Sequence, residues 1–382
     1  MSIYLDYNAS TPIDDRVLDT MVTAYREHFG NADSRTHLHG QNARNAVENA
    51  RREVASLLSV ESNEVIFTSG ATESDNLAVL GLEEHGVSTN RRHIVTTSIE
   101  HKAVLEAANH LRKNGFEVEL VNPEISGRVN TESILSKVRR DTLLVSVQHV
   151  NNETGIIQPV KEIGDVLWDT RTFFHIDAVQ SCGKLVDEVN GLKYDMLSLS
   201  AHKMHGPQGV GALILRRMNN KRPPIRPIVF GGGHEGGLRA GTLPVALIVG
   251  FGKACEIAQA EYLSNLAGFK ENKRRIMDAI KISEVSYEIN GAPDYCIDNT
   301  LNISFLGVDS EALMIATKQY CSISNGSACT SSDYSPSNVL TAMGLPEARI
   351  ESAVRLSWGT EHFCGNVFLQ LLRKVKDQQQ SD

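Results

Sequence analysis

Lys203 is the residue in this sequence that is best placed to do covalent chemistry. An apolar strand pattern over residues 196–199 runs into Ser200, and His202 and Lys203 follow directly. A Gly-Pro pair at 206–207 prevents a helix from continuing, so we expect the lysine at a turn just after a strand. A lone lysine beside such a turn is usually a solvated surface residue. Its amine is a candidate partner for a carbonyl group only if the rest of the chain builds a site around it.

Some enzymes bind the aldehyde group of the cofactor pyridoxal 5'-phosphate (PLP) covalently to such a lysine. Other residues of this chain could bind the ring of PLP. Its nitrogen needs a buried carboxylate, and Asp177 follows the apolar run 173–176. Its phenolic oxygen needs a donor, and Gln180 is three residues further on. Its face needs a flat partner, for which His101 is a candidate. Each residue also has an ordinary explanation, Asp177 as a helix cap and His101 as a solvated residue at a helix start.

A phosphate group would find donors where a predicted strand turns into a helix. A glycine, Ala71 and Thr72 occupy that turn. The free backbone N–H groups and the helix dipole favour an anion there, and the Thr72 hydroxyl can add a donor. We expect Ser200 and His202 to lie close by. An ordinary helix cap remains the alternative, since Thr72 followed three residues later by Asp75 also suits a helix N-terminus.

The strands that must position these residues form an α/β pattern. Seven predicted strands, most of them continuous apolar runs, alternate with helical patterns between residues 64 and 215. This predicts a mostly parallel sheet covered by helices on both faces, with ligands at the carboxyl ends of the strands. A long helical pattern over 245–282 then leads to a smaller α+β region. We expect a large domain over 16–256 and a small domain made of 1–15 and 257–382.

Composition excludes several other functions. The 382 residues carry a formal net charge of −8, which disfavours direct nucleic-acid binding by bulk electrostatics. No apolar run is long enough to span a bilayer, and the N-terminus lacks a signal-peptide pattern, so we expect a cytoplasmic protein without membrane contact. The six cysteines match no zinc spacing, and we expect no metal site. The G-x-G-x-x-G run at 231–236 is followed by a loop pattern instead of a helix, which argues against dinucleotide binding.

Two residues of the predicted small domain could complete a site. Cys329 lies in the small, polar segment 324–336, whose composition predicts a mobile loop. A thiol in such a loop suits a nucleophile, although an incidental exposed cysteine is the alternative. Arg355 lies in a predicted strand at 353–358 and could bind a substrate carboxylate, unless it is simply a charge on an edge strand.

Taken together, the motifs resemble the NifS/IscS-type cysteine desulfurases, which are class V members of the fold-type I (aminotransferase-like) PLP enzymes. The resemblance covers essentially the whole chain. The runs that carry it are Tyr4-Leu5-Asp6, Thr68-Ser69-Gly70-Ala71-Thr72-Glu73-Ser74, Glu100-His101-Lys102, His149-Val150-Asn151-Asn152-Glu153-Thr154-Gly155, His175-Ile176-Asp177-Ala178-Val179-Gln180, Ser200-Ala201-His202-Lys203, Arg239-Ala240-Gly241-Thr242-Leu243-Pro244 and Gly326-Ser327-Ala328-Cys329.

The resemblance implies a reaction and a role for each residue. L-cysteine would become L-alanine, with Lys203 moving the proton at Cα and the Cys329 thiolate attacking the substrate sulfur. The product on the protein would be a persulfide on Cys329, ready for transfer to an acceptor protein. His101 would stack on the PLP ring, Asn152 would contact cofactor or substrate, and Arg355 would bind the substrate carboxylate.

The resemblance also implies partners. Thr242 would reach the phosphate of the other subunit's cofactor, which predicts an obligate homodimer. The chain is most similar to the desulfurases of DNA phosphorothioation systems (DndA-type), partly because it extends only a short way beyond the small domain. We therefore expect a DNA-modification sulfurtransferase as the acceptor. A housekeeping desulfurase for iron–sulfur clusters or tRNA thiolation, a selenocysteine lyase and a non-catalytic sulfur-relay scaffold on an inactive PLP fold are the alternatives.

Overall fold

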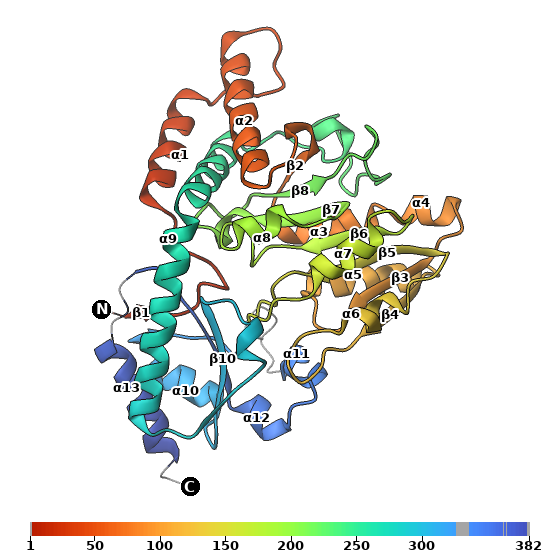
Figure 1. Ribbon diagram of the computed structural model, residues 1–382. Coiled ribbons are helices and arrows are strands. Elements are labelled where there is room, and N and C mark those ends of the chain that lie inside the picture. The colour runs from red at the N-terminus through yellow and green to blue at the C-terminus, as the bar shows by residue number, and fades with distance from the viewer. Residues whose placement is uncertain (1, 326–335, 362, 364, 380–382) are drawn as a thin grey trace.

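A seven-stranded sheet forms the centre of the protein in a computed structural model that describes residues 2–325, 336–361, 363 and 365–379 (Figure 1). The order of its strands is β2-β8-β7-β6-β5-β3-β4. β8 runs antiparallel to both of its neighbours, and the other pairings are parallel, so the predicted sheet is confirmed. The strands are β2 (Val65–Thr68), β3 (His93–Thr97), β4 (Glu117–Val121), β5 (Thr142–Gln148), β6 (Phe173–Asp177), β7 (Met196–Ser200) and β8 (Gly211–Leu215).

Helices cover both faces of this sheet because its strands are apolar on both sides. All seven residues of β5 are buried, and residues of this strand join two different apolar clusters. Val145 packs with the cluster that includes α2 and α7, whereas Leu144 packs with the cluster under α3 and α5. The helices of this part are α1 (Asp15–Glu27), α2 (Leu38–Leu57), α3 (Ala71–Leu80), α4 (Glu83–Ser88), α5 (Lys102–Lys113), α6 (Thr131–Leu135), α7 (Val160–Leu167) and α8 (Val186–Asn190).

The 39-residue helix α9 (Val245–Ser283) joins the sheet to the rest of the chain (Figure 1). Its first half packs closely against α1 and α2, because one glycine leaves room for each of these helices. A Cβ at Gly252 would lie 2.6 Å from the Cα of Ala50, and one at Gly250 would lie 2.5 Å from the Cγ of Met21. This helix confirms the long helical pattern expected over 245–282. The domain boundary at 256 stays a prediction, since α9 runs through it unbroken.

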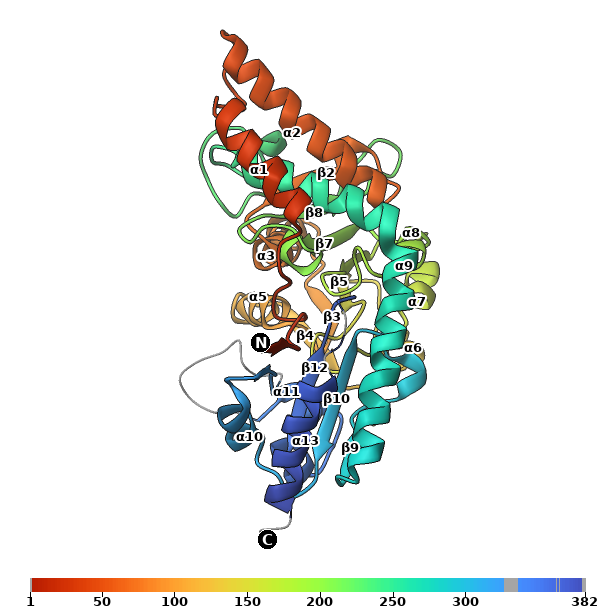
Figure 2. The ribbon, with the colours of Figure 1, turned by 90° about the vertical axis from the view of Figure 1, so that its left-hand side faces the viewer.

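The C-terminal part is built on an antiparallel sheet with the order β12-β10-β9. Its core includes Phe305 and Phe368, and Leu5 of the N-terminal arm packs into the same cluster. Accordingly, Figures 1 and 2 both show the N-terminal strand beside this part. The elements are β1 (Ile3–Tyr4), β9 (Tyr287–Ile289), β10 (Thr300–Phe305), α10 (Ser310–Thr317), β11 (Cys321–Ser322), α11 (Asn338–Ala342), α12 (Glu347–Glu351), β12 (Ala353–Ser357) and α13 (Gly365–Gln379).

No helix within the described part of the chain combines the length and the apolar character that crossing a bilayer requires. Four cysteines of that part, Cys182, Cys255, Cys296 and Cys321, are free thiols.

Candidate active site

A cavity of about 420 Å³ opens where the strands β2, β5, β6 and β7 end. Most of the site residues predicted from the sequence line this one cavity. They are Ala71, Thr72, His101, Asn152, Asp177, Gln180, Ser200, His202, Lys203 and Arg355. Thr242 is exposed and is not among the residues that line it. Cys329 lies outside the described residues.

Lys203 ends a single 3₁₀ turn, Ala201–Lys203, that follows β7. Its Nζ donates to two backbone carbonyl oxygens of the N-terminal arm, at 2.6 Å from Asn8 and 2.7 Å from Ala9. The arm therefore closes one side of the cavity and holds the amine inside it. This environment differs from that of a solvated surface lysine, which was the alternative at the sequence level.

Asp177 presents a buried carboxylate at the end of β6. It is 7% exposed, and its Oδ1 accepts a hydrogen bond of 3.0 Å from the backbone N–H of Val179. Burial raises the pKa of this carboxyl, and electrostatic interactions with His101 and Lys203 act in the opposite direction. A protonated ring nitrogen would supply a counter-charge at this point, so the residue fits the role that PLP requires.

His101 caps the N-terminus of α5 and also faces the cavity. Its Nδ1 accepts a hydrogen bond of 3.2 Å from the backbone N–H of Ala103, which places a proton of the neutral ring on Nε2. Burial lowers the pKa of the imidazole, so the ring is neutral near pH 7. His101 is thus a helix-start residue, as one interpretation of the sequence held, but it is directed into the site instead of into solvent.

The N-terminus of α3 forms an anion cradle. Its N-cap is Gly70, so Thr72 lies within the first turn and is not the cap. Because glycine has no side chain, the first N–H groups of the helix receive no side-chain cap. The backbone comes close to β8 here, since a Cβ at Gly211 would lie 2.8 Å from the Cα of Gly70. His202 lies beside this cradle, and burial followed by the charge of Lys203 lowers its pKa to about 4. The phosphate of PLP suits these donors.

Arg355 reaches the cavity from β12, and it is 2% exposed. Nη2 donates to Oδ1 of Asp6 at 2.6 Å, and Nη1 donates to the backbone oxygen of Asn152 at 3.0 Å. Its Nε is buried and has no hydrogen-bond partner among the described residues. Although β12 lies at the end of the strand order of the small sheet, the arginine is buried and is not a surface charge.

Both ends of the segment that carries Cys329 lie close to the site. Before it, Ser324 exchanges backbone hydrogen bonds with Arg355, from the Ser324 N–H at 3.3 Å and from the Arg355 N–H at 2.5 Å. After it, the hydroxyl of Ser337 donates to Oε2 of Glu153 at 2.5 Å, and Glu153 follows Asn152 in the chain. The residues between these two anchors, 326–335, are outside the described part.

Sequence reasoning missed several residues that shape the cavity. Asn8 acts through its backbone carbonyl, which leaves no signature in the sequence. Asp75 was considered only as part of an alternative helix cap, yet it is 0% exposed, and burial together with the nearby Asp177 raises its pKa well above the usual range. Glu100 is buried beside it, and burial raises the pKa of that carboxyl to about 8.

A cluster that could hold a metal ion was also not visible in the sequence. His93, Glu117 and Glu119 bring three ligand atoms within 4.8 Å of one another on β3 and β4. Glu119 is, however, paired with Lys137, and Glu117 with Arg139. Because both carboxylates already have cationic partners, the cluster is explained as a surface ion-pair network.

Comparisons with known proteins agree with this geometry. The family described as Aminotransferase class-V matches residues 3–362. A protein of Anaeromyxobacter sp. strain Fw109-5 named Cysteine desulfurase IscS is 44% identical over 379 residues, which cover 98% of this chain and 92% of that protein. A relative with the same name from Haemophilus influenzae strain PittGG is 43% identical and covers 94% and 88% of the two chains.

Solved structures show the same similarity. A structure titled NifS-like protein superposes with a TM-score of 0.90 at 35% identity and covers 100% of both chains. The crystal structure of DndA from Streptomyces lividans has a TM-score of 0.81 at 44% identity and covers 94% of this chain and 99% of that one. A structure titled SspA in complex with cysteine has a TM-score of 0.81 at 36% identity, with the same coverage.

Proposed function

This chain belongs to the aminotransferase class-V family, and on that basis we propose that it is a PLP-dependent cysteine desulfurase. The reaction converts L-cysteine to L-alanine and leaves the sulfur on Cys329 as a persulfide. One observation carries the proposal: Lys203, Asp177 and the uncapped start of α3 line the same cavity, with an amine, a buried acid and an anion cradle for the three parts of PLP.

Each residue of the cavity has a defined task in this proposal. PLP, when bound, supplies an electron sink that makes the Cα proton of the substrate acidic. Lys203 takes and returns that proton, and Asp177 keeps the ring nitrogen protonated. Gln180 donates to the phenolic oxygen, and His101 lies against the ring. Asn152 contacts cofactor or substrate.

Arg355 binds the substrate carboxylate in this proposal. Its position in the cavity wall supports the assignment, because a carboxylate is the natural partner of a guanidinium. Asp6 already accepts from Nη2, so the substrate must share the guanidinium with it or displace it.

Cys329 receives the sulfur. Its thiolate attacks the substrate sulfur, an S–S bond forms and the C–S bond breaks. The electron pair of the broken bond stays on the substrate carbon, which takes up a proton and becomes the methyl group of alanine. Cys329 is five residues beyond Ser324, so an extended chain limits the distance between the two Cα atoms to about 18 Å. That range includes the cavity, because Ser324 pairs with Arg355.

The experiment is mass spectrometry of the holoprotein after exposure to L-cysteine. We expect one added sulfur atom on the peptide that contains Cys329, together with one alanine released per turnover. Cys329→Ala should lose both signals. Cys296→Ala, which removes a free thiol elsewhere in the chain, is the matched control and should keep them. Sulfur on another cysteine, or alanine formation by Cys329→Ala, would count against the mechanism.

Related assays distinguish two alternative functions from the proposed one. A selenocysteine lyase would turn over selenocysteine without a thiol, so Cys329→Ala would retain that activity. A non-catalytic sulfur-relay scaffold would lack the visible absorbance of PLP bound to Lys203. The intact set of Lys203, Asp177 and His101 in the cavity supports the enzyme.

A homodimer is part of the proposal. Large apolar side chains of α1 and of the segment around it are exposed, among them Tyr25 at 62%, Phe29 at 69% and Leu38 at 66%. A surface of this kind suits a protein interface. Thr242, outside the cavity of its own chain, would complete the phosphate site of the partner subunit. Light scattering should give twice the chain mass, and Thr242→Ala should weaken PLP binding in the dimer.

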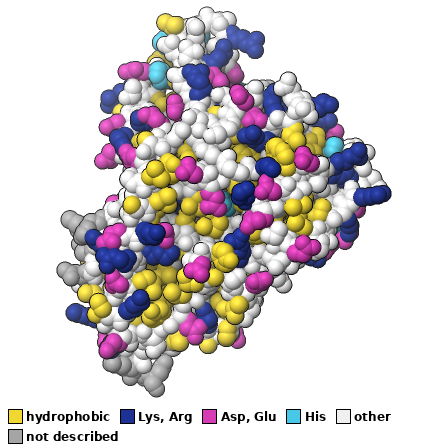
Figure 3. Space-filling view, in the orientation of Figure 1, with side chains coloured by type: hydrophobic (Ala, Val, Ile, Leu, Met, Phe, Trp, Pro, Cys, Tyr) yellow, Lys and Arg dark blue, Asp and Glu magenta, His cyan; other side chains and the backbone are white. Residues whose placement is uncertain are grey.

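The sulfur acceptor is proposed to be a DNA-modification sulfurtransferase. The 44% identity to DndA of Streptomyces lividans supports this, although the IscS relatives are equally identical and keep an iron–sulfur or tRNA-thiolation partner as the second candidate. Direct nucleic-acid binding is disfavoured, because cationic and anionic side chains are interspersed on the face in Figure 3. Pull-down with both acceptor types decides, and capture of an iron–sulfur scaffold alone would contradict the proposed partner.

We also propose a cytoplasmic location. The four free thiols of the described residues suit a reducing compartment.

A further inference from the structure

Lys184 is a buried lysine for which the proposed mechanism gives no task. It is 6% exposed, and none of the ion pairs between described residues includes it. Burial, followed by the charges of Lys203 and Arg355, lowers the pKa of its amine to about 7. A charge is therefore unfavourable at this position, and an apolar side chain would be easier to bury. A specific contact is needed to account for an amine here.

That contact is with the side chain of Gln180. The Nζ of Lys184 donates to Oε1 of Gln180 at 3.2 Å. The two residues are four apart on a segment of consecutive turns, in which the Lys184 N–H donates to the oxygen of Ser181 at 3.0 Å. Such turns bring side chains four residues apart to the same side.

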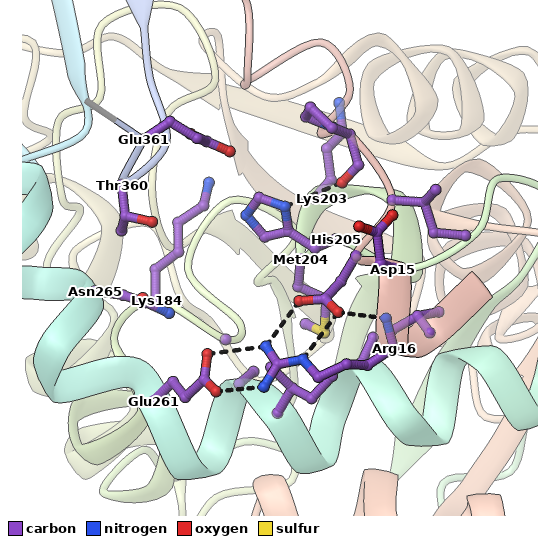
Figure 4. A pocket seen from close by; sticks show the side chains of 18 of the residues that line it. Asp15, Arg16, Lys184, Lys203, Met204, His205, Glu261, Asn265, Thr360 and Glu361 are labelled. Atoms are coloured by element: carbon purple, nitrogen blue, oxygen red, sulfur yellow. Dashed lines mark hydrogen bonds and ion pairs between the residues drawn. The ribbon is translucent and has the colours of Figure 1, made fainter. Parts of the chain in front are cut away.

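A continuous set of hydrogen bonds joins Lys184 to the catalytic lysine. The Nε2 of Gln180 donates to the backbone oxygen of Asn8 at 2.9 Å. The same oxygen accepts from Nζ of Lys203 at 2.6 Å, which uses both of its lone pairs. Lys184 and Lys203 also line one cavity of about 500 Å³, and Figure 4 shows both side chains at its wall.

The chemistry of these groups fixes the orientation of the Gln180 amide. In its charged form, which is populated at and below about pH 7, the amine of Lys184 has three donors and no acceptor, so it can bind only the amide oxygen. A flipped amide would face the ammonium with its NH₂ group and would face the Asn8 oxygen with another oxygen. Both hydrogen bonds of the Gln180 amide, whose residue is 4% exposed, would be lost at once.

We propose that Lys184 is a positioning residue that locks the Gln180 amide and, through the shared Asn8 oxygen, holds the amine of Lys203. The lock directs the NH₂ group of Gln180 away from Lys184, which leaves one N–H for the Asn8 oxygen and one for the cavity. The inference rests on the proposed function, in which that second N–H donates to the phenolic oxygen of PLP. A carboxamide and a backbone carbonyl do not exchange protons readily, so these bonds orient groups and do not conduct protons.

The test measures PLP affinity of the full-length protein by titrating PLP-free protein and following the visible absorbance. Lys184→Met removes the donor. Lys184→Gln keeps a polar group, but that group can both donate and accept, so it no longer distinguishes the oxygen of the Gln180 amide from its NH₂ group. Both should weaken PLP binding about tenfold, which corresponds to the loss of one hydrogen bond to a charged group. Lys184→Arg, which has donors only, should restore most of the affinity. Lys193→Met, an exposed lysine paired with Asp165, is the control and should leave it unchanged.

A double variant separates positioning from a general structural role. If Lys184 acts through Gln180, then Lys184→Met combined with Gln180→Leu should bind PLP no more weakly than Gln180→Leu alone. The melting temperature of PLP-free Lys184→Met should equal or exceed that of the wild type, because a buried charge is removed.

Two results would overturn the inference: unchanged PLP affinity in Lys184→Met and Lys184→Gln, or affinity losses that add fully in the double variant. A lower melting temperature with unchanged affinity would assign Lys184 to the fold alone and would also overturn it. Failure of the wild-type protein to bind PLP or to release alanine from L-cysteine would instead refute the proposed function, so the two failures are distinguishable.

Discussion

Replacing Arg355 with leucine should weaken L-cysteine binding far more than PLP binding. The guanidinium lines the cavity and has two partners, Asp6 and the backbone oxygen of Asn152, while its Nε has none among the described residues. A substrate carboxylate that binds this guanidinium would form a charge-assisted hydrogen bond with it. PLP has no contact assigned to this residue, so its affinity should change little.

The size of the effect follows from the contacts. A hydrogen bond between charged groups contributes about 1.5–3 kcal/mol, and about 1.4 kcal/mol corresponds to a factor of ten, so KM should rise about 10- to 100-fold. The lost ion pair should also lower the free energy of unfolding. Because the Arg355 side chain is 3% exposed and that of Asp6 is 20% exposed, we expect a loss of about 1–3 kcal/mol, between that of a surface pair and that of a buried one.

The assay is the initial rate of alanine formation against L-cysteine concentration, with PLP content measured on the same samples. Arg349→Leu is a matched control. Like Arg355, Arg349 pairs with a carboxylate and donates to a backbone oxygen, those of Glu288 and Ile289, but it does not line the cavity. It should lose stability without a change in KM. An unchanged KM in a folded, PLP-loaded Arg355→Leu protein would refute the assignment of the substrate carboxylate to this residue.

Three further predictions test the surroundings of the site. Asp6→Asn should lower KM for L-cysteine several-fold in the same assay, since it removes the carboxylate that competes for Arg355; an increase would contradict this competition. Glu100→Gln should remove a pH dependence of stability. Burial raises the folded-state pKa of Glu100 to about 8 from an unfolded value of 4.5, so the bound proton stabilises the fold at low pH. The free energy of unfolding of the wild type should therefore fall as pH rises from 4.5 to 8, by at most about 1.4 kcal/mol per pH unit. Denaturant unfolding at several pH values measures this, and equal slopes for both proteins would refute it. Gly252→Ala should lower the unfolding free energy by about 1–3 kcal/mol, because its Cβ would lie 2.6 Å from the Cα of Ala50 in α2, whereas Gly365→Ala, which meets no atom within 4 Å, should be near neutral.

The positions of many site residues could be predicted because they lie at the ends of strands. Parallel strands place their carboxyl ends at one edge of a sheet, so Asp177, Ser200 and Lys203 had to lie close together once the strands were identified. Whether Thr72 is a helix cap or part of an anion site could not be decided in this way. The answer depends on where α3 begins, and the N-cap of α3 is Gly70.

The roles of Asn8 and Asp75 could not be predicted for a different reason. Asn8 acts through a backbone oxygen, and every residue has one, so nothing in its side chain indicates the contact with Lys203. Asp75 has the spacing of a helix-capping acid, and only its complete burial next to Asp177 distinguishes it. Side-chain type reports chemistry, whereas burial and backbone contacts are properties of the folded chain.

Local patterns predict the order of strands and helices and the residues at the strand ends, because apolar runs and the glycines and prolines that interrupt them are local features. Three contacts became visible only in the folded chain: the arm at Asn8 closes over Lys203, Arg355 of β12 enters the same cavity, and Lys184 and Gln180 connect to them. These contacts join residues up to about 200 positions apart. They depend on how α9 returns the C-terminal part of the chain to the edge of the sheet, and no local pattern encodes that path.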